Sequence, residues 1–206
     1  MGLPRLLSGA FAVVLLSACT ISGQPPVTAL SSPTRPSQSP PPTDVPFLRC
    51  DTKDLEMQVI GTNGAASNVI AIIEVRNKSS HDCDLYGYAG LQLLDAHGGP
   101  LPTQVSWSNE SYFGTVPAAT IVRLPADTVQ ISADRPVPGH AYIPIIWGDS
   151  SGNCEGVGQF RVTPPGATTS TVVSASSPGG GQGVAIICSG GFVIINPTRA
   201  AIPSAS

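Results

Sequence analysis

Hydrophobic and polar residues alternate along much of this chain in short runs, the pattern of half-buried β-strands. Asp54 to Ile60 alternates polar and apolar positions with a period of two. Asn68 to Arg76 is rich in β-branched residues and is apolar on both faces in its middle. No segment keeps an apolar period of 3.6 residues, so the pattern predicts strands and no long helix in the folded part.

Turn residues separate these segments at regular intervals. Gly61-Thr62-Asn63-Gly64 is expected to form a turn, Asn77–Ser80 to end a strand, and Asp95–Gly99 to form a hairpin turn. The other expected strands are the apolar end of Cys83–Leu94, Leu101–Val105 (an edge strand because of Pro102), Ala119–Leu124, Thr128–Ile131, Ala141–Trp147, Gly158–Thr163, Thr169–Ser174, Gly183–Cys188 and Phe192–Ile195, with a loop at Ser176–Gly183. Such a series predicts an all-β fold, an immunoglobulin-like β-sandwich.

The N-terminus has the features of an export signal. Arg5 precedes an apolar run, Leu6–Leu16, which is too short to span a bilayer as a mature helix. Leu16-Ser17-Ala18-Cys19 then resembles the lipobox of bacterial lipoproteins. The resemblance implies removal of residues 1–18 as a signal peptide, diacylglycerol on the Cys19 thiol and an acyl chain such as palmitate on its amine. The alternative is an ordinary secretory signal with an incidental cysteine.

Residues 19–49 form a linker between this signal and the domain. Pro, Ser and Thr dominate it, so it lacks the apolar surface that folding requires. An extended polyproline-like linker of this length holds the domain up to about 80 Å from a membrane. In related lipoproteins such tracts are often O-mannosylated, and Thr28, Thr34 and Thr43 would be the candidates here; an unmodified spacer is the alternative.

Composition excludes one class of partner. The formal net charge is −3, and the basic residues are scattered along the chain rather than gathered in a stripe. Nucleic acid is therefore not an expected partner. The expected partners are a membrane, through the lipid anchor, and an envelope protein or glycan, with no cofactor.

Four cysteines follow Cys19, and an even number in an exported chain predicts disulfides. Three pairings are possible. We favour Cys50–Cys83 with Cys154–Cys188, because each joins cysteines that are neighbours in sequence and fixes one end of the domain. A zinc site is the competing interpretation, but the chain contains no C-x₂-C or H-x₃-H spacing.

A family resemblance is carried by Cys83-Asp84-Leu85-Tyr86-Gly87-Tyr88-Ala89-Gly90, which is similar to the C-x-L-x-G-Y-P-G signature of the actinobacterial family known as domain of unknown function 4232. Asn77 at a strand end, Pro164-Pro165-Gly166 and the late Cys188 agree with that family. Ala89 replaces the usual proline, so the turn there is expected to be less rigid. The resemblance covers about Cys50 to Pro197, and we expect the β-sandwich domain to span residues 50–199 with a short tail at 200–206. It implies export or lipid anchoring and no established activity.

Two polar clusters invite a chemical interpretation. Gly148-Asp149-Ser150-Ser151-Gly152 is similar to the nucleophile segment of trypsin-like proteases, but none of the three histidines has the expected context, so a hydrolase using Ser150 or Ser151 is only an alternative. His81-Asp82-Cys83-Asp84 cannot converge on one metal ion, because consecutive strand residues point to opposite faces. No catalytic residue and no metal site are predicted.

The stretch Val105–Gly114 mixes aromatic and polar residues without clean alternation. Trp107, Asn109, Tyr112 and Phe113 are its candidates for recognising a sugar or a protein. The competing interpretation is that Trp107 and Phe113 fill the sandwich. We therefore expect a non-enzymatic, lipid-anchored module on the outer face of the cytoplasmic membrane that binds an envelope component, with a structural role in a membrane complex as a further alternative.

Overall fold

The structure, a computed structural model, describes residues 46–126, 139–149, 152–176 and 185–202. Their only helical turn is η1 (Thr52–Asp54). The strands are β1 (Leu55–Ala65), β2 (Asn68–Asn77), β3 (Cys83–Leu85), β4 (Gly90–Leu94), β5 (Gln104–Trp107), β6 (Val122–Leu124), β7 (His140–Gly148), β8 (Glu155–Val157), β9 (Gln159–Thr163), β10 (Thr171–Ser174), β11 (Ala185–Ile187) and β12 (Phe192–Ile195).

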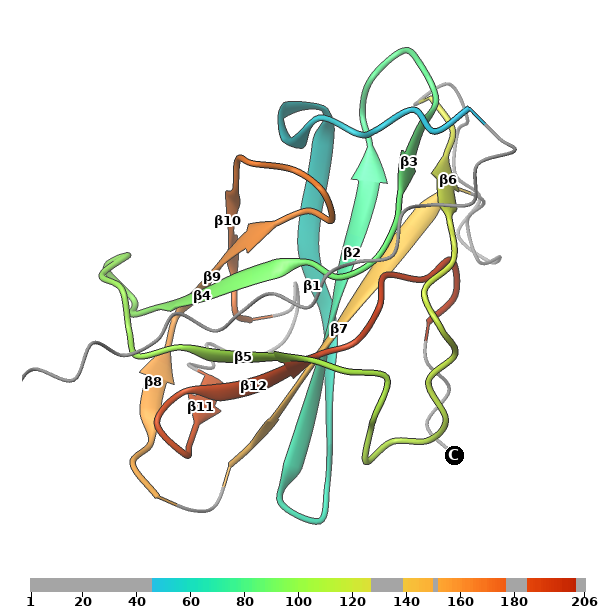
Figure 1. Cartoon of the computed structure of the whole chain (residues 1–206). Coiled ribbons are helices and arrows are strands. Elements are labelled where there is room, and N and C mark those ends of the chain that lie inside the picture. Colours follow the sequence, from blue (N-terminus) through green and yellow to red (C-terminus); the bar gives the residue numbers. More distant parts are fainter. Residues whose placement is uncertain (1–45, 127–138, 150–151, 177–184, 203–206) are drawn as a thin grey trace, which may run out of the picture. The chain divides into compact units, whose positions relative to one another are not determined.

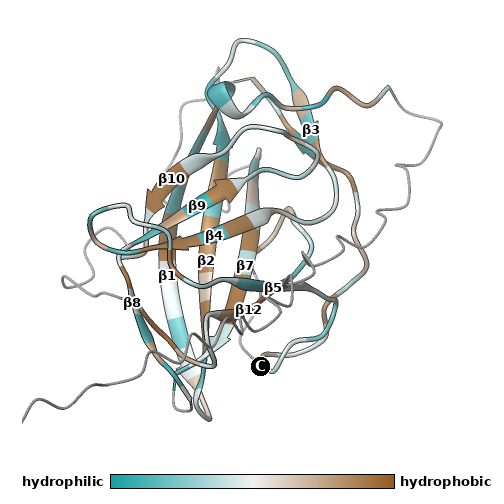
Figure 2. Ribbon diagram, turned by 60° about the vertical axis from the view of Figure 1, so that its left-hand side comes forward, coloured by the Kyte–Doolittle hydropathy of each residue, from teal (hydrophilic) through white to brown (hydrophobic). Residues whose placement is uncertain are grey.

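These strands form an all-β sandwich (Figure 1). One layer is a five-stranded sheet in the order β1-β2-β7-β12-β5, antiparallel except where β5 runs parallel to β12. A three-stranded antiparallel sheet, β10-β9-β4, lies across β1, β2 and β7 as the second layer (Figure 2). Two short pairs, β11-β8 and β3-β6, complete the fold.

The core lies between the two layers and follows from strand alternation. Inward residues of β1 and β2, such as Val59, Ile73 and Val75, are at most 1% exposed. They belong to one cluster with Leu93 of β4 and Phe160 of β9, which are fully buried. Burial of these branched and aromatic side chains is the main source of stability, at about 25 cal/mol per Å² of apolar area.

A smaller apolar cluster lies on the opposite face of the five-stranded sheet. Ile70 and Ile72 of β2 pack there with Tyr142 and Ile146 of β7, and all four are buried. Phe113, from the segment between β5 and β6, packs against them. This segment therefore contributes to covering the outer face of the sheet, and we call the four buried residues the outer cluster.

Both disulfides have the pairing that the sequence favoured. Cys50–Cys83 joins the start of the domain to β3, and Cys154–Cys188 joins the residue before β8 to the residue after β11, at sequence separations of 33 and 34. The described chain is thus an immunoglobulin-like all-β sandwich with two disulfides, as expected. The expected signal peptide, the linker up to residue 45 and Cys19 lie outside the described residues.

The expected turn at Gly61-Thr62-Asn63-Gly64 is wrong. These residues continue β1, which pairs with β2 as far as Ala65↔Asn68, after a bulge between Val59 and Gly61. The reversal falls on Ala66 and Ser67, whose φ angles are +49° and +63°. Two left-handed residues make the short hairpin turn that matches strand twist, although Asn and Gly usually occupy it. The glycines and the asparagine of residues 61–64 therefore lie in the part of β1 that follows the bulge, and the chain reverses only after them.

The expected return strand Leu101–Val105 is also displaced. The chain does reverse at Asp95–Gly99, and the Leu101 amide donates to the Leu93 carbonyl at 2.9 Å. It then leaves β4, and β5 pairs with β12 at an edge of the five-stranded sheet. The two segments approach closely at Gly191, where a Cβ would lie 2.0 Å from the Pro102 carbonyl oxygen. Strand β8 was not predicted, and the expected strand Thr128–Ile131 lies outside the described residues.

Candidate functional site

The family signature forms β3 and the loop that leads into β4. Cys83, Asp84 and Leu85 are all buried in β3, which pairs with β6. The chain then turns through Gly87, whose φ of +97° is easily reached only by glycine. Ala89, where the signature expects proline, is 1% exposed. The Gly87 carbonyl accepts a hydrogen bond from the Thr198 amide at 2.9 Å, so the C-terminal segment holds this loop.

The aromatic segment lies against the same loop. Trp107 ends β5 and packs partly buried against the main core, and its indole Nε1 donates to the Ala89 carbonyl at 2.7 Å. The Tyr88 hydroxyl donates to the Asn109 side-chain oxygen at 2.5 Å. Two stretches that the sequence singled out separately are therefore joined by two hydrogen bonds.

A buried asparagine fixes the segment from below. Asn196 follows β12 and is 1% exposed, and its side-chain amide donates to the carbonyls of Ser108 and Glu110, each at 2.9 Å. These two hydrogen bonds from one buried side chain hold the backbone on both sides of Asn109. The exposed amide of Asn109 is thus presented by a backbone that has little freedom to move.

What we call the Tyr88–Asn109 surface comprises Tyr86, Tyr88 and Asn109, together with Tyr112, which follows Asn109 by three residues in the aromatic segment. Tyr112 is 71% exposed and Asn109 is exposed, whereas both tyrosines of the signature are half-buried. Burial, and secondarily the neighbouring Tyr86, raise the pKa of Tyr88, so its phenol stays protonated and can donate. Of the predicted recognition residues, Trp107 and Phe113 are instead turned partly into the two apolar clusters.

A pocket that the sequence analysis missed lies elsewhere on the five-stranded sheet. It has a volume of about 190 Å³ and is lined by Glu56, Gln58, Glu74, Arg76 and His140. Four of these occupy alternate polar positions of two predicted strands, so their common face could have been read from the sequence. His140 could not have been added, because it belongs to β7 and the pairing of distant strands is not encoded locally.

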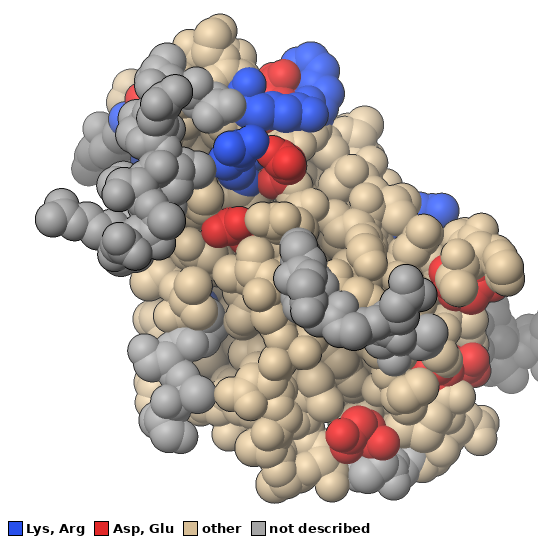
Figure 3. Space-filling view, turned by 180° about the vertical axis from the view of Figure 1, so that it is seen from behind, with Lys and Arg blue, Asp and Glu red and all other residues tan. Residues whose placement is uncertain are grey.

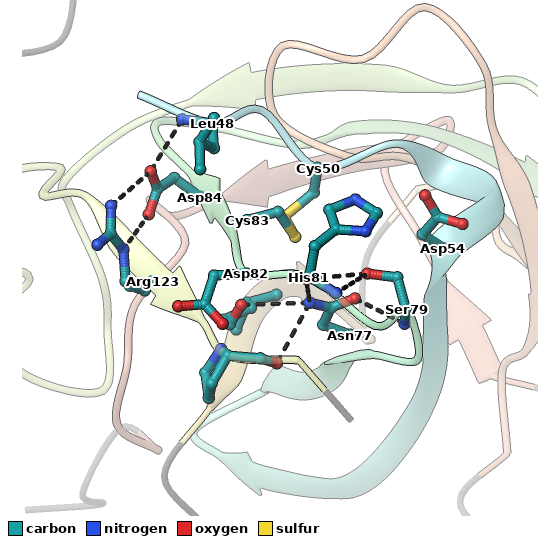
Figure 4. Close-up of a disulfide and its surroundings, with 12 residues drawn as sticks. Leu48, Cys50, Asp54, Asn77, Ser79, His81, Asp82, Cys83, Asp84 and Arg123 are labelled. Carbon is teal, nitrogen blue, oxygen red and sulfur yellow. Dashed lines mark hydrogen bonds and ion pairs between the residues drawn. A yellow bond between two sulfur atoms is a disulfide. The ribbon is translucent and has the colours of Figure 1, made fainter. Parts of the chain in front are cut away.

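Buried hydrogen bonds and an ion pair surround the Cys50–Cys83 disulfide (Figure 4). Asp84 is 1% exposed and accepts hydrogen bonds from the Leu48 amide at 3.0 Å and from Arg123 at 3.0 and 3.2 Å. Asn77, also buried, donates to the carbonyls of His81, Leu124 and Pro125. These groups are saturated by the protein itself, which indicates a structural role for His81 to Asp84.

Metal binding, serine chemistry and membrane spanning were the other possibilities to compare with the described residues. No group of three His, Cys, Asp or Glu among them is arranged to hold a metal ion. Ser150 and Ser151 lie outside the described residues. The helical content of the described ranges includes nothing long and apolar enough to cross a membrane.

Fold and site together define a disulfide-bonded β-sandwich domain with a rigidly presented polar and aromatic surface. The chain belongs to the family described as Domain of unknown function (DUF4232), whose model matches residues 50–189. No curated protein and no solved structure matches the chain.

Proposed function

We propose that the protein is a lipid-anchored module of the cell envelope, held on the outer face of the cytoplasmic membrane through Cys19, that binds a protein or glycan ligand without catalysing a reaction. The observation that carries the binding role is the hydrogen bond from Tyr88 to Asn109. It joins the family signature to the only stretch of the sequence that was singled out for recognition.

The chemistry of the Tyr88–Asn109 surface suits such a ligand. Tyrosine offers a flat apolar face with a polar edge, and asparagine offers both a donor and an acceptor. Rigid aromatic anchors dominate binding energy because little side-chain freedom is lost when they are covered. Asn196 beneath the loop supplies this rigidity to the surface.

Export and anchoring rest on the lipobox-like Leu16–Cys19 and agree with two disulfides, since such bonds persist in oxidising compartments. Acyl chains anchor stably when two or more are present, because each buried CH₂ contributes about 0.8 kcal/mol. Metabolic labelling of cells with a clickable fatty acid tests this part. Wild-type protein should be labelled and Cys19→Ala should not; equal labelling of both would reject the anchor.

The binding role is tested by crosslinking in native membranes with matched variants of the full chain. Tyr112→Ala should reduce crosslinking to the partner at least about tenfold, whereas its stability should change by less than about 0.5 kcal/mol, because the side chain is exposed. Phe192→Ala removes an aromatic ring that is 41% exposed elsewhere and should have no effect on capture. Unchanged capture by the Tyr112 variant would contradict the assignment. Reaction of Ser150 or Ser151 with a fluorophosphonate probe would contradict the non-enzymatic role.

A further inference from the structure

The pocket on the outer face of β1, β2 and β7 is built from cross-strand pairs. Glu56 lies opposite Arg76, which lies opposite His140, so these three form one row across the sheet. Gln58 lies opposite Glu74 in the next row. Directly opposite residues have side chains close enough to interact, so the pairing itself brings the polar groups together. Charged side chains gather at the end of the molecule where β1 begins and β2 ends (Figure 3).

Hydrogen-bond donors of the pocket are engaged by its own carboxylates. Arg76 Nη2 donates to Glu56 at 2.5 Å, and Gln58 Nε2 donates to Glu74 at 2.9 Å. The Nδ1 of His140 lies 2.7 Å from the other oxygen of Glu74, so an imidazole with a proton on Nδ1 donates it to this carboxyl group. The side chain of His140 is 8% exposed and that of Glu74 is 17% exposed.

The hydrogen-bonding atoms of the pocket that remain available to a ligand are mainly acceptors. In the neutral tautomer with its proton on Nδ1, His140 has a lone pair on Nε2, and no described residue is seen hydrogen-bonded to that nitrogen. The Oε1 of Gln58 and the second lone pairs of both carboxylates are acceptors as well. The described lining residues include two carboxylates, of Glu56 and Glu74, and one guanidinium, of Arg76, so the carboxylates are in excess by 2 − 1 = 1.

From this arrangement we infer that the pocket binds a primary ammonium group. An ammonium is a compact cation with three donors and no acceptor, which complements a small concave site whose lining has one more carboxylate than guanidinium and several acceptor atoms. An anionic ligand would be repelled by the Glu74 carboxylate. A neutral diol would bring no positive charge to compensate that of the carboxylate. The ammonium belongs to a small amine, an amino sugar or a lysine side chain. The site is separate from the Tyr88–Asn109 surface and does not depend on the proposed function.

The test uses calorimetric titration of the full chain with 1,4-diaminobutane, alongside 1,4-butanediol and succinate of similar length. The diamine should bind saturably, and the diol and succinate should bind at least about tenfold more weakly. Glucosamine against its N-acetyl form, and a lysine peptide against its acetyl-lysine form, then distinguish the source of the ammonium.

Two variants place the binding in the pocket. Glu74→Gln keeps the size of the side chain and removes its charge, and it should weaken diamine binding at least about tenfold. Glu56 is 55% exposed, so Glu56→Gln should fold normally and also weaken binding even if the Glu74 variant is unstable. Glu155→Gln, in β8, removes the same charge elsewhere and should bind as the wild type does. Absence of diamine binding up to about 10 mM, equal binding of the diol, or unchanged binding in Glu56→Gln would each overturn the inference.

Discussion

At the scale of single residues, the clearest structural group is the carboxylate of Asp84. It is buried in β3, and it holds the chain ahead of the domain through Leu48 and the neighbouring strand through Arg123. Burial alone would raise its pKa, but the hydrogen bonds from Arg123 and Leu48 outweigh burial and lower the pKa. A buried charge that is paired and hydrogen-bonded in this way stabilises the fold only while it remains ionised.

Replacing Asp84 with Asn should lower the free energy of unfolding by about 2–3 kcal/mol at neutral pH, because two charge-assisted contacts are lost. The sign of the pH effect follows from the lowered pKa. The Asp84 contribution is complete above the unfolded pKa of about 3.9 and is lost as pH falls through the lower folded value. Denaturant unfolding between neutral and acid pH should therefore show a smaller loss of stability in the variant.

Some acid sensitivity should persist in that variant, because backbone amides of Gly99 and His97 lower the pKa of Asp95. Asp149→Asn, at an exposed position, is the matched control and should leave the curve unchanged. If stability fell equally with pH in the Asp84→Asn and Asp149→Asn variants, the stabilising role of the Asp84 carboxylate would be refuted.

Substitutions of Trp107 can separate the contributions of packing and of hydrogen bonding to the stability of the fold. The ring packs against the core and its N–H is bonded to Ala89. Trp107→Phe should cost about 1 kcal/mol, mainly the hydrogen bond, whereas Trp107→Ala should cost about 3 kcal/mol because packing is lost as well. Thermal unfolding measures both, with the exposed Tyr112→Ala as the control. A loss below about 0.5 kcal/mol for Trp107→Ala would mean that the ring is not packed in solution.

At the scale of elements, the sequence identified β2 and β7 as apolar runs because both faces of these strands are largely buried, and it identified β12 as a short apolar strand. It failed where structure depends on partners far along the chain. The parallel pairing of β5 with β12 and the extension of β1 past Gly61 have no local signal. The residues of the candidate surface could be predicted, since the sequence singled out both Tyr88 and Asn109. Their contact could not, because it forms only when the chain is folded.

The β1–β2 turn should be improvable. Ala66 and Ser67 both have positive φ, and a side chain in this region costs about 1 kcal/mol relative to glycine. Replacing the pair with Asn-Gly should raise the free energy of unfolding by about 1–2 kcal/mol, as measured by denaturant unfolding. Ser80→Gly, at an exposed position without positive φ, should instead be slightly destabilising because it loosens the unfolded chain. A loss of stability in the Asn-Gly variant would argue against the left-handed turn.

At the scale of the whole molecule, two disulfides of nearly equal loop size secure different regions. Each should contribute about 3–4 kcal/mol in the chain-entropy model. They differ in access, since Cys154 is exposed whereas Cys50 and Cys83 are 1% and 3% exposed.

Mild reduction of the native protein should therefore open Cys154–Cys188 first, because a thiolate must reach a sulfur atom to attack it. Timed alkylation followed by mass spectrometry should show labelled Cys154 and Cys188 while Cys50 and Cys83 remain unlabelled. The same experiment in denaturant is the control and should remove the difference. Simultaneous labelling of all four cysteines in the native state would contradict the expected order.

The position of Cys50 also bears on mechanical load. It lies immediately ahead of η1 and β1, and β1 is an edge strand that a pull from the N-terminal side would otherwise peel from β2. The bond to Cys83 gives the force a covalent path around the residues between the two cysteines. Tension then passes from the chain at Cys50 to β3, and the closed loop that contains the β1–β2 hairpin carries none of it. A pull applied at Cys50 would therefore leave the pairing of β1 with β2, and the five-stranded sheet that contains it, under no direct load.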